Sequence, residues 1–248
     1  MPDNRHHRGA HPEDAQLFAP EQLAALRTAV GDLSWLLSRG YASISAVKVV
    51  GDRYSLNARQ RIAVMRCSCG DAACEARSAR CASSEALAGR VALIDGYNLL
   101  ITIEAALGGG VVLIGRDGCY RDMASMHGTY RSVDETIPAL MLIGNRLNEL
   151  QVARTLWYLD SPVSNSGRLK GVMADVAEKQ GWDWQIELVH NPDAVLLKSK
   201  PDDGVVISAD SAILEGELAW YPLANDVVQR DVSSAWIVDL RAPSAREP

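Results

Sequence analysis

Three apolar segments of this 248-residue chain each stop at an aspartate. The segment VALID ends at Asp95, TLWYLD ends at Asp160, and VVISAD ends at Asp210. All three are typical of buried strands. Ligands of open parallel sheets bind beyond the carboxyl ends of the strands, so neighbouring strands would bring the three carboxylates into one crevice. One aspartate after a strand is often just a turn or helix-capping residue, and it is the recurrence that favours a shared site.

Carboxylates that lie close together repel one another unless a cation neutralises them. The three segments offer oxygen ligands without histidine or cysteine, which favours Mg²⁺ or Mn²⁺ over zinc. An ion or ion pair in such a site orients a water molecule and stabilises the charge that develops on a phosphate during in-line attack. We therefore predict that Asp95, Asp160 and Asp210 are both metal ligands and catalytic residues.

The same segments resemble the motifs of a known superfamily. LIDGYNLL, around Asp95, resembles the first motif of the PIN-like nucleases, especially of their NYN branch, in which a strand ends in D-G-x-N. WYLD resembles the second strand-end aspartate of that branch, and SADSAIL resembles its last acidic motif. The resemblance covers about residues 91–225. It implies an α/β fold of the PIN-like type, with three layers around a central, mainly parallel sheet.

The resemblance also implies an activity, that of a metal-dependent ribonuclease with Mg²⁺ or Mn²⁺ at the three aspartates. In this reading Asn98 supports the first loop beside the substrate, and Ser211 caps the helix that follows Asp210. The layout further resembles an uncharacterised prokaryotic family that joins an N-terminal helical unit to a PIN-like domain. A module of the same fold that binds RNA or a protein partner without cleaving it is the alternative.

Many PIN-like nucleases carry a further acidic residue on a helix between the first and last motifs. The candidates in this sequence are Glu104, Asp117, Asp122 and Glu135. We favour Asp122, and then Glu104, as additional catalytic residues. The place of Glu104 depends on whether residues 99–107 form a helix or a strand, which the sequence leaves open.

Arginines near the acidic motifs are candidates for contact with RNA. The segment GRDGCYRDMASMHGTYR mixes arginines with carboxylates, which suits a phosphate backbone and suits a salt-bridged surface loop equally well. In the helical region ahead of it, two arginines lie seven residues apart and can share a helix face. The candidate substrate-binding arginines are Arg116, Arg121, Arg131, Arg59 and Arg66.

Ser164 and Asn165 are further candidates, because they precede a helix that we expect to begin near residue 167. Hydroxyl groups and free backbone N–H groups at a helix start can bind an anion. Simple capping of the helix by Asn165 or Ser166 is the alternative, and the two roles are compatible. His127 could act as an acid or base at neutral pH, but it has no located partner and is left out of the core site.

Four of the five cysteines crowd into 15 residues, at Cys67, Cys69, Cys74 and Cys81. Clusters of this kind in cytosolic proteins more often bind metal or react than form disulfides. The spacing is not that of paired C-x-x-C knuckles, so thiols of a helical segment are the leading interpretation and a zinc site is the weaker one.

The surrounding pattern predicts the elements that position these residues. Leucines and a valine recur at helical spacing after Pro20, and Gly40 follows where a helix can end. We divide the chain into a flexible leader (1–12), a basic helical domain with the cysteine cluster (13–88) and a PIN-like catalytic domain (89–248). The expected strands are 91–94, 111–114, 155–159, 185–189, 204–208 and 219–223, and the expected helices are about 134–153, 167–180 and a short one after Asp210. Trp182 and Trp184 are expected to pack in the core.

Composition sets the broad class. With 48% hydrophobic and 23% charged residues the chain can bury a large core, and no apolar run is long enough to span a bilayer. Residues 1–90 hold 12 Lys and Arg against 9 Asp and Glu, whereas residues 91–248 hold 13 against 22. A basic front and an acidic back suit a protein that grips an anion and holds cations. We expect a cytoplasmic protein that acts on RNA and not on membranes, and the sequence leaves a homo-oligomer open.

Overall fold

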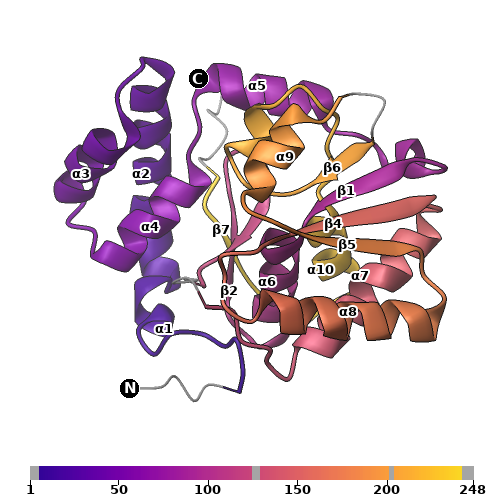
Figure 1. Cartoon of the computed structure of the whole chain (residues 1–248). Helices are drawn as coiled ribbons and strands as arrows, with labels where there is room; N and C mark the ends of the chain where they lie inside the picture. The colour runs from indigo at the N-terminus through magenta and orange to yellow at the C-terminus, as the bar shows by residue number, and fades with distance from the viewer. Residues whose placement is uncertain (1–5, 125–128, 201–203, 242–248) are drawn as a thin grey trace.

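The larger of two sheets organises the part of the chain that follows residue 90. The computed structural model describes residues 6–124, 129–200 and 204–241. In this part of the chain, sheet A has four parallel strands in the order β5-β4-β1-β6 (Figure 1). The strands are β1 (Val91–Asp95), β4 (Arg154–Asp160), β5 (Trp184–Val189) and β6 (Val205–Ile207).

The strand order places the three aspartate-terminated segments side by side. β1 lies in the middle, where Ala92 is in register with Thr155 of β4 on one side and with Val205 of β6 on the other. The chain builds outward from β1 to β4 and β5 and then returns to the opposite side of β1 with β6. Such a reversal creates a crevice at the carboxyl ends of the strands. The crevice of this protein therefore lies between β1 and β6.

Alternate side chains of sheet A enter two different cores, as the pleat of a strand requires. Ile94 belongs to the main core beneath α6, α7, α8 and α10, whereas its neighbour Leu93 belongs to a smaller core beneath α9 and η3. The protein is thus an α/β structure with a covered sheet. These elements are α6 (Gly96–Leu107), α7 (Thr136–Glu149), α8 (Ser166–Gln180), α9 (Pro192–Lys198), α10 (Leu223–Asp231) and η3 (Ile213–Glu215).

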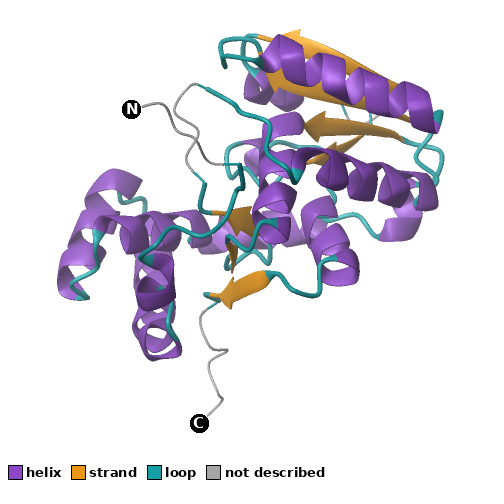
Figure 2. Ribbon diagram, turned by 90° about the horizontal axis from the view of Figure 1, so that it is seen from below, coloured by secondary structure: helices purple, strands orange, loops and turns teal. Residues whose placement is uncertain are grey.

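A smaller mixed sheet joins the N-terminal helices to the rest. In sheet B, β2 (Val111–Ile114) pairs antiparallel with β3 (Tyr120–Asp122) and parallel with β7 (Trp236–Asp239). Leu113 and Val238 of this sheet pack in one core with Leu33 and Val64 of the helical unit. Figure 2 shows the N-terminal helices beside these strands. The helical unit therefore completes its core with strands from far along the chain.

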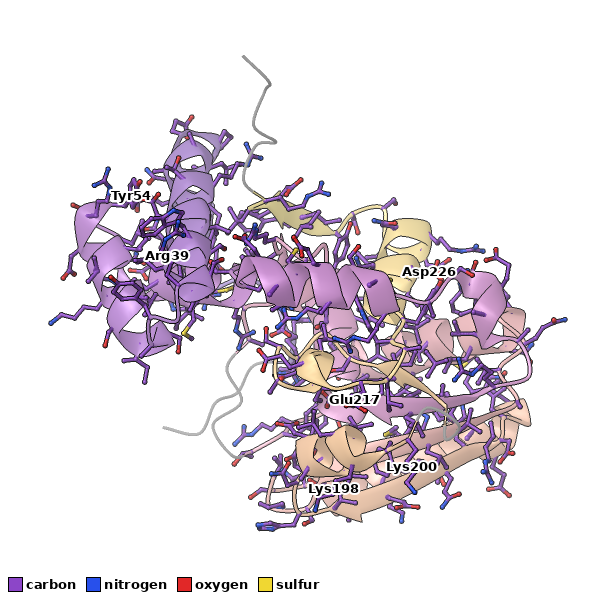
Figure 3. All side chains as sticks on the ribbon, turned by 90° about the horizontal axis from the view of Figure 1, so that it is seen from above. Arg39, Tyr54, Lys198, Lys200, Glu217 and Asp226 are labelled. Carbon is purple, nitrogen blue, oxygen red and sulfur yellow. The ribbon has the colours of Figure 1, made fainter. Side chains whose placement is uncertain are left out.

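The helical unit itself begins before residue 20 and ends before sheet A. Its elements are α1 (Asp14–Leu17), α2 (Pro20–Ser38), α3 (Ser43–Arg53), α4 (Ala58–Cys67), α5 (Asp71–Arg80) and η1 (Ser84–Leu87). Helices α2 to α4 project from the body of the protein, with Arg39 and Tyr54 at this end of the molecule (Figure 3). No helix in the described ranges is both long enough and apolar enough to cross a membrane.

The structure corrects several expectations about these elements. Residues 219–223 do not form a strand; Trp220 makes only isolated bridges, to Cys81 and to Val206. Residues 99–107 lie in helix α6, which settles the question left open by the sequence. β3, β7, α9 and α10 were not predicted, because each is short and its stability comes from packing against distant elements. Trp182 packs against the main core and stacks on Trp184, as expected.

The prediction of a flexible leader is wrong for the described residues from His6 onward. Arg8 Nε donates to the fully buried carboxylate of Glu104 over 2.6 Å, and the Arg8 guanidinium lies above the Tyr130 ring. His7 contacts Glu135 through its Nδ1 atom at 2.7 Å. The leader thus supplies the counter-charge for a buried glutamate, a role that no local sequence pattern reveals.

The contact between Gly144 and Trp182 gives a direct test of this packing. A Cβ atom on Gly144 would overlap the Trp182 ring, whereas a Cβ on Gly171, also inside a helix, meets no atom within 4 Å. We expect Gly144→Ala to lower the free energy of unfolding by about 1–3 kcal/mol, because overpacking outweighs the gain in helix propensity. Gly171→Ala should raise it by up to about 1 kcal/mol. Urea unfolding measures both, and equal effects of the two changes would contradict the packing described here.

Candidate functional site

Asp95 ends β1 and is buried at the carboxyl edge of sheet A. Its Oδ2 atom accepts a hydrogen bond of 2.9 Å from the hydroxyl of Ser208, which follows β6. Burial of the carboxyl group, reinforced by the negative charges of Asp210 and Asp193, raises the pKa of Asp95 from 3.8 to about 7. The group therefore holds a proton readily when no cation is near.

The glycine after Asp95 is required by close packing. A Cβ atom on Gly96 would lie 2.5 Å from Leu159 Cδ2 and 3.0 Å from the carbonyl oxygen of Tyr158. Two residues further, Asn98 Oδ1 accepts a hydrogen bond of 2.8 Å from the Ala209 N–H. The D-G-x-N segment thus packs against β4 and is tied to the loop after β6.

Asp210 lies in that loop, half-buried. Its N–H donates to Ser208 Oγ over 3.0 Å, so one serine links the backbone of Asp210 to the carboxylate of Asp95. Its Oδ1 atom accepts a hydrogen bond of 2.7 Å from the Ala212 N–H and so caps the turn into η3. The expectation that Ser211 caps this helix is therefore wrong, because the capping oxygen belongs to Asp210.

Asp160 ends β4 and is half-buried, and it shares its surroundings with an aspartate that the sequence analysis missed. Asp193 lies in the first turn of α9. The pKa of Asp160 is raised by partial burial and, to a smaller extent, by the charge of Asp193. The pKa of Asp193 is raised by partial burial and, to a smaller extent, by the charge of Asp210. A local signal existed: Pro192 begins the helix and Asn191 Oδ1 accepts from the Ala194 N–H, as helix starts commonly show.

The four aspartates, Asp95, Asp160, Asp193 and Asp210, form one electrostatically coupled set at the carboxyl edge of sheet A. No three His, Cys, Asp or Glu side chains among the described residues lie close enough together to hold one metal ion. This donor set does not suit zinc, which takes three or four protein ligands. It suits Mg²⁺, which keeps several waters and binds through one or two carboxylates.

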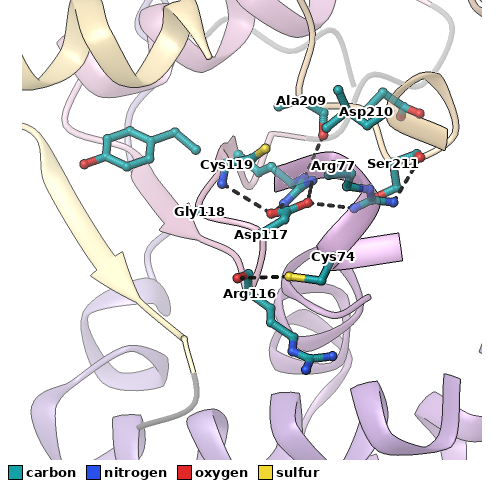
Figure 4. Close-up of polar contacts among 12 residues, drawn as sticks. Cys74, Arg77, Arg116, Asp117, Gly118, Cys119, Ala209, Asp210 and Ser211 are labelled. Atoms are coloured by element: carbon teal, nitrogen blue, oxygen red, sulfur yellow. Dashed lines mark hydrogen bonds and ion pairs between the residues drawn. The ribbon is translucent and has the colours of Figure 1, made fainter. Parts of the chain in front are cut away.

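A buried cluster of charges braces the loop that carries Asp210 (Figure 4). The Asp117 carboxylate accepts hydrogen bonds of 2.6 Å from Arg77 and of 2.7 and 2.8 Å from Arg121. The same arginines donate to the carbonyls on either side of Asp210: Arg121 Nε to Ala209 and Arg77 Nη2 to Ser211. Burial opposes the charge on Asp117, but its bonds to the two guanidinium groups hold its pKa at about 2. Arg121 is therefore a buried structural residue and is not free to bind substrate.

A pocket of about 450 Å³ opens beside Asp210. It lies between α4 of the helical unit, β3, the start of α6 and the loop after β6. Asp122 lines it, with its Oδ2 atom accepting from Thr102 Oγ1 over 3.1 Å and its Oδ1 atom from the Ala124 N–H over 2.7 Å. The other lining residues are Met65, Arg66, Tyr97, Asn98, Ile101, Arg121, Ala124, Ala209, Asp210 and Ser211.

Asp122 and Glu104, the two further acids favoured from the sequence, lie in different surroundings. Asp122 shares a pocket with Asp210. Glu104 is instead fully buried and accepts hydrogen bonds from Tyr130 and Thr136 besides Arg8. Burial raises the pKa of Glu104 despite these donors. It anchors the N-terminal segment through Arg8 and does not line the pocket beside Asp210, and its catalytic role stays a prediction.

Most of the other predicted substrate residues have structural partners. Arg59 pairs with the buried Asp14, Arg116 pairs with Asp71 over 2.5 Å, and Arg131 is exposed away from the pocket lining. Arg66 alone among the five predicted arginines lines the pocket with a partly exposed side chain.

The side chains of the loop after β4, where an anion site is predicted, contact other parts of the protein. Asn165 adopts a left-handed backbone conformation with φ of 72°, and its side chain donates to the Tyr130 carbonyl. Helix α8 begins at Ser166, whose hydroxyl contacts Tyr97 Oη and the Asp160 and Val163 carbonyls. Neither side chain caps the helix, and the Ser164 carbonyl accepts from the Tyr130 N–H. This loop therefore packs Tyr97 and Tyr130 beside Asp160. His127 lies outside the described residues.

The four clustered cysteines do not assemble a metal site. Cys67 and Cys69 are buried, Cys74 is partly buried and Cys81 is exposed. Burial raises the pKa values of Cys67 and Cys69 to about 12, so these thiols stay protonated in the protein without metal. They belong to no group of three potential ligands. Cys67 lies at the end of α4 and Cys74 within α5.

Removal of the Asp117 charge should destabilise the fold. Asp117→Asn leaves the buried Arg121 guanidinium without a counter-charge and Arg77 with only the exposed Glu215 carboxylate, 3.8 Å away, so we expect the free energy of unfolding to fall by about 3–5 kcal/mol. Asp71→Asn is the matched control: it removes the exposed carboxylate that pairs with Arg116 and should lower the free energy of unfolding by at most about 1 kcal/mol. Because the pKa of Asp117 is lowered, its contribution is present above pH 4 and is lost as the pH falls toward 2. Urea unfolding at pH 7 measures both changes, and an equal decrease in the free energy of unfolding for the two variants would refute the structural role of Asp117.

The buried carboxyl of Asp95 should make the metal-free protein less stable as the pH rises. Its raised pKa means that the native state keeps a proton that the unfolded chain releases, so stability is lost from about pH 4 to pH 7. Asp95→Asn keeps an acceptor for Ser208 and removes this loss, and it should gain roughly 1–3 kcal/mol at pH 8 in EDTA. Unfolding curves across this range measure the difference. Parallel pH profiles of the two proteins would contradict the burial of a titrating group.

Sequence comparison finds relatives without an assigned function. The model of a domain of unknown function (DUF5616) matches residues 84–226, and that of a protein of unknown function (DUF434) matches residues 25–86. The chain is 27% identical over 197 residues to the uncharacterized protein MJ0935 of Methanocaldococcus jannaschii, which covers 79% of this chain and 92% of that protein. No solved structure matches the chain. Because the first model spans more than half of the chain and all four aspartates, this protein belongs to the DUF5616 family.

Proposed function

We propose that this protein is a metal-dependent ribonuclease of the PIN-like, NYN type that acts on RNA in the cytoplasm. The observation that carries the proposal is the strand order β4-β1-β6, which brings Asp95, Asp160 and Asp210 to one edge of sheet A. Asp193 of α9 supplies the further acid that many PIN-like nucleases have on a helix. The electrostatic coupling of the four groups supports a site built for a cation.

Mg²⁺ or Mn²⁺ fits the site through Asp95 and Asp210, with Asp160 and Asp193 as the remaining carboxylates. When bound, such an ion supplies an activated water and stabilises charge on the phosphate that is attacked. Ser208 fixes the Asp95 carboxylate by its hydrogen bond, and Asn98 holds the Asp210 loop against the start of α6. Asp95 releases its proton when a cation neutralises the set, so metal uptake should be tighter at higher pH.

The four aspartates at the carboxyl edge of sheet A form what we call the acidic edge. Positive charge beside this acidic edge favours an anionic substrate. The buried cluster of Arg77, Arg121 and Asp117 carries more positive than negative charge and lies against the backbone on both sides of Asp210. Fixed positive charge in a water-poor environment stabilises negative charge nearby more strongly than it would in water. We infer that this cluster lowers the cost of bringing a phosphate to four carboxylates.

A non-catalytic RNA- or protein-binding module is the second candidate. The observation in its favour is that the four aspartates do not include three that are close enough to share an ion directly. A titration of the protein with Mn²⁺ by calorimetry, together with an RNA cleavage assay, separates the candidates. Metal uptake with cleavage supports the nuclease, and RNA binding with neither supports the module.

Substitution of Asp193 tests the proposal at the residue that the sequence motifs did not reveal. We expect Asp193→Asn to lower the rate of RNA cleavage in Mn²⁺ by at least about a hundredfold, because it removes one of the acidic groups around the ion. Asp175→Asn, at an exposed aspartate of α8, is the control and should cleave like the wild-type protein. Full activity of Asp193→Asn under matched metal concentrations would overturn the assignment of this fourth carboxylate.

A further inference from the structure

The pocket beside Asp210 has one wall that the sheet domain does not supply. Met65 and Arg66 come from α4 of the helical unit, whereas Tyr97, Asn98 and Ile101 come from α6. The pocket is therefore complete only when the helical unit is docked on sheet B. Its volume of about 450 Å³ lies within the range of sites that bind small organic ligands.

The lining divides into an apolar part and a polar part. Met65, Ile101 and Tyr97 line the apolar part; Ile101 and Tyr97 are buried, whereas Met65 is exposed, with 44% of the residue accessible. Asp122 and Asp210 lie on the polar side, where they would repel a phosphate that entered deeply. A flat, uncharged heterocyclic ring suits this interior better than an anion does.

Arg66 is placed to meet an anion at the mouth of the pocket. Its guanidinium donates to the carbonyls of Asp122 and Ala124, which fixes its position. About a third of the side chain, 34%, stays accessible, and the nearest carboxylate, that of Asp122, is 3.5 Å away. Arg121, the other arginine in the lining, is buried and is engaged with Asp117 and Ala209. Arg66 is thus the arginine of this pocket that a phosphate can reach.

We propose that this pocket is a nucleotide subsite, which receives the nucleotide next to the scissile phosphate of an RNA strand. The base lies against Met65, Ile101 and Tyr97, and a backbone phosphate contacts Arg66. This inference rests on the proposed nuclease function and deepens it, because it makes the helical unit part of the substrate site. The helical unit then selects the strand that reaches the acidic edge.

The test measures binding separately from cleavage. A fluorescently labelled short single-stranded RNA is titrated with the Asp95→Asn protein in Mg²⁺ and followed by anisotropy. Adding Met65→Glu or Arg66→Ala should weaken binding by about tenfold or more, and Arg66→Lys should restore part of it. The controls are Ile62→Glu, one turn earlier on the same helix and exposed, and Arg53→Ala, an exposed arginine of α3. Both should bind like the parent protein.

Cleavage kinetics give a second measurement. In the otherwise wild-type protein, Met65→Glu and Arg66→Ala should raise KM several-fold and change kcat little, since they act on binding and not on the acidic edge. Thermal unfolding checks that each variant folds. If Arg66→Ala does not fold, Met65→Glu still provides the test, because Met65 is exposed. If both variants bind RNA as tightly as the two controls while the wild-type protein cleaves it, the subsite is refuted and the nuclease stands. If they lose binding in a protein that cleaves no RNA, the nuclease is refuted, and the pocket is an RNA-binding site without a scissile phosphate beside it.

Discussion

The arrangement of the acidic edge depends on one buried carboxylate held between two arginines. Asp117 lies in the turn between β2 and β3, Arg77 comes from α5 of the helical unit, and Arg121 comes from β3. Because both arginines also bond the backbone on either side of Asp210, three distant segments are fixed together. Buried ion pairs contribute little net stability, but they specify geometry strongly when each partner is hydrogen-bonded. Arg77 Nε is one of two buried side-chain polar atoms, among the described residues, without a hydrogen-bond partner.

The four carboxylates of the acidic edge lower the stability of the folded state, because they are partly buried and repel one another. Four carboxylates share a small region, and the most deeply buried of them, Asp95, has a pKa raised to about 7. A protein without use for that charge would gain stability from an asparagine or a serine there. Groups with such raised pKa values cluster at functional sites, because a ligand supplies the missing counter-charge. The Arg77–Asp117–Arg121 cluster fixes the loop that carries Asp210, and the proposed function assigns a cation to the four carboxylates.

The sequence predicted what depends on local pattern. Strands that are apolar along their length and end in aspartate gave the positions of Asp95, Asp160 and Asp210, and the parallel sheet followed from strands alternating with helices. The significance of Asn98 followed from its place in the D-G-x-N segment. The pocket residues Arg66 and Asp122 were named as candidates, but their meeting in one pocket needed the docking of α4 on sheet B.

What the sequence missed depends on distant partners. Glu104 is anchored by a leader residue about a hundred positions earlier, so no local pattern separates it from a catalytic acid. Arg121 was taken for a substrate contact because arginine beside aspartate looks the same whether the pair is buried or exposed. Asp193 lies in a helix of seven residues with no amphipathic repeat, although its Asn-Pro start was a readable signal. For Glu104 and Arg121 burial decided the role, whereas the exposed Asp193 gains its place from the packing of α9 beside sheet A, and both are properties of the assembled chain.

The central proposal is that a divalent cation binds at the carboxyl edge of sheet A through Asp95 and Asp210, with Asp160 and Asp193 beside it. A crystal structure of the protein soaked in Mn²⁺, with anomalous differences recorded, tests it most directly. We expect an anomalous peak bound by at least one of Asp95 and Asp210, with Asp160 and Asp193 around it and water completing the coordination. A peak at the cysteines or elsewhere, with none at this edge in the presence of excess Mn²⁺, would contradict the claim.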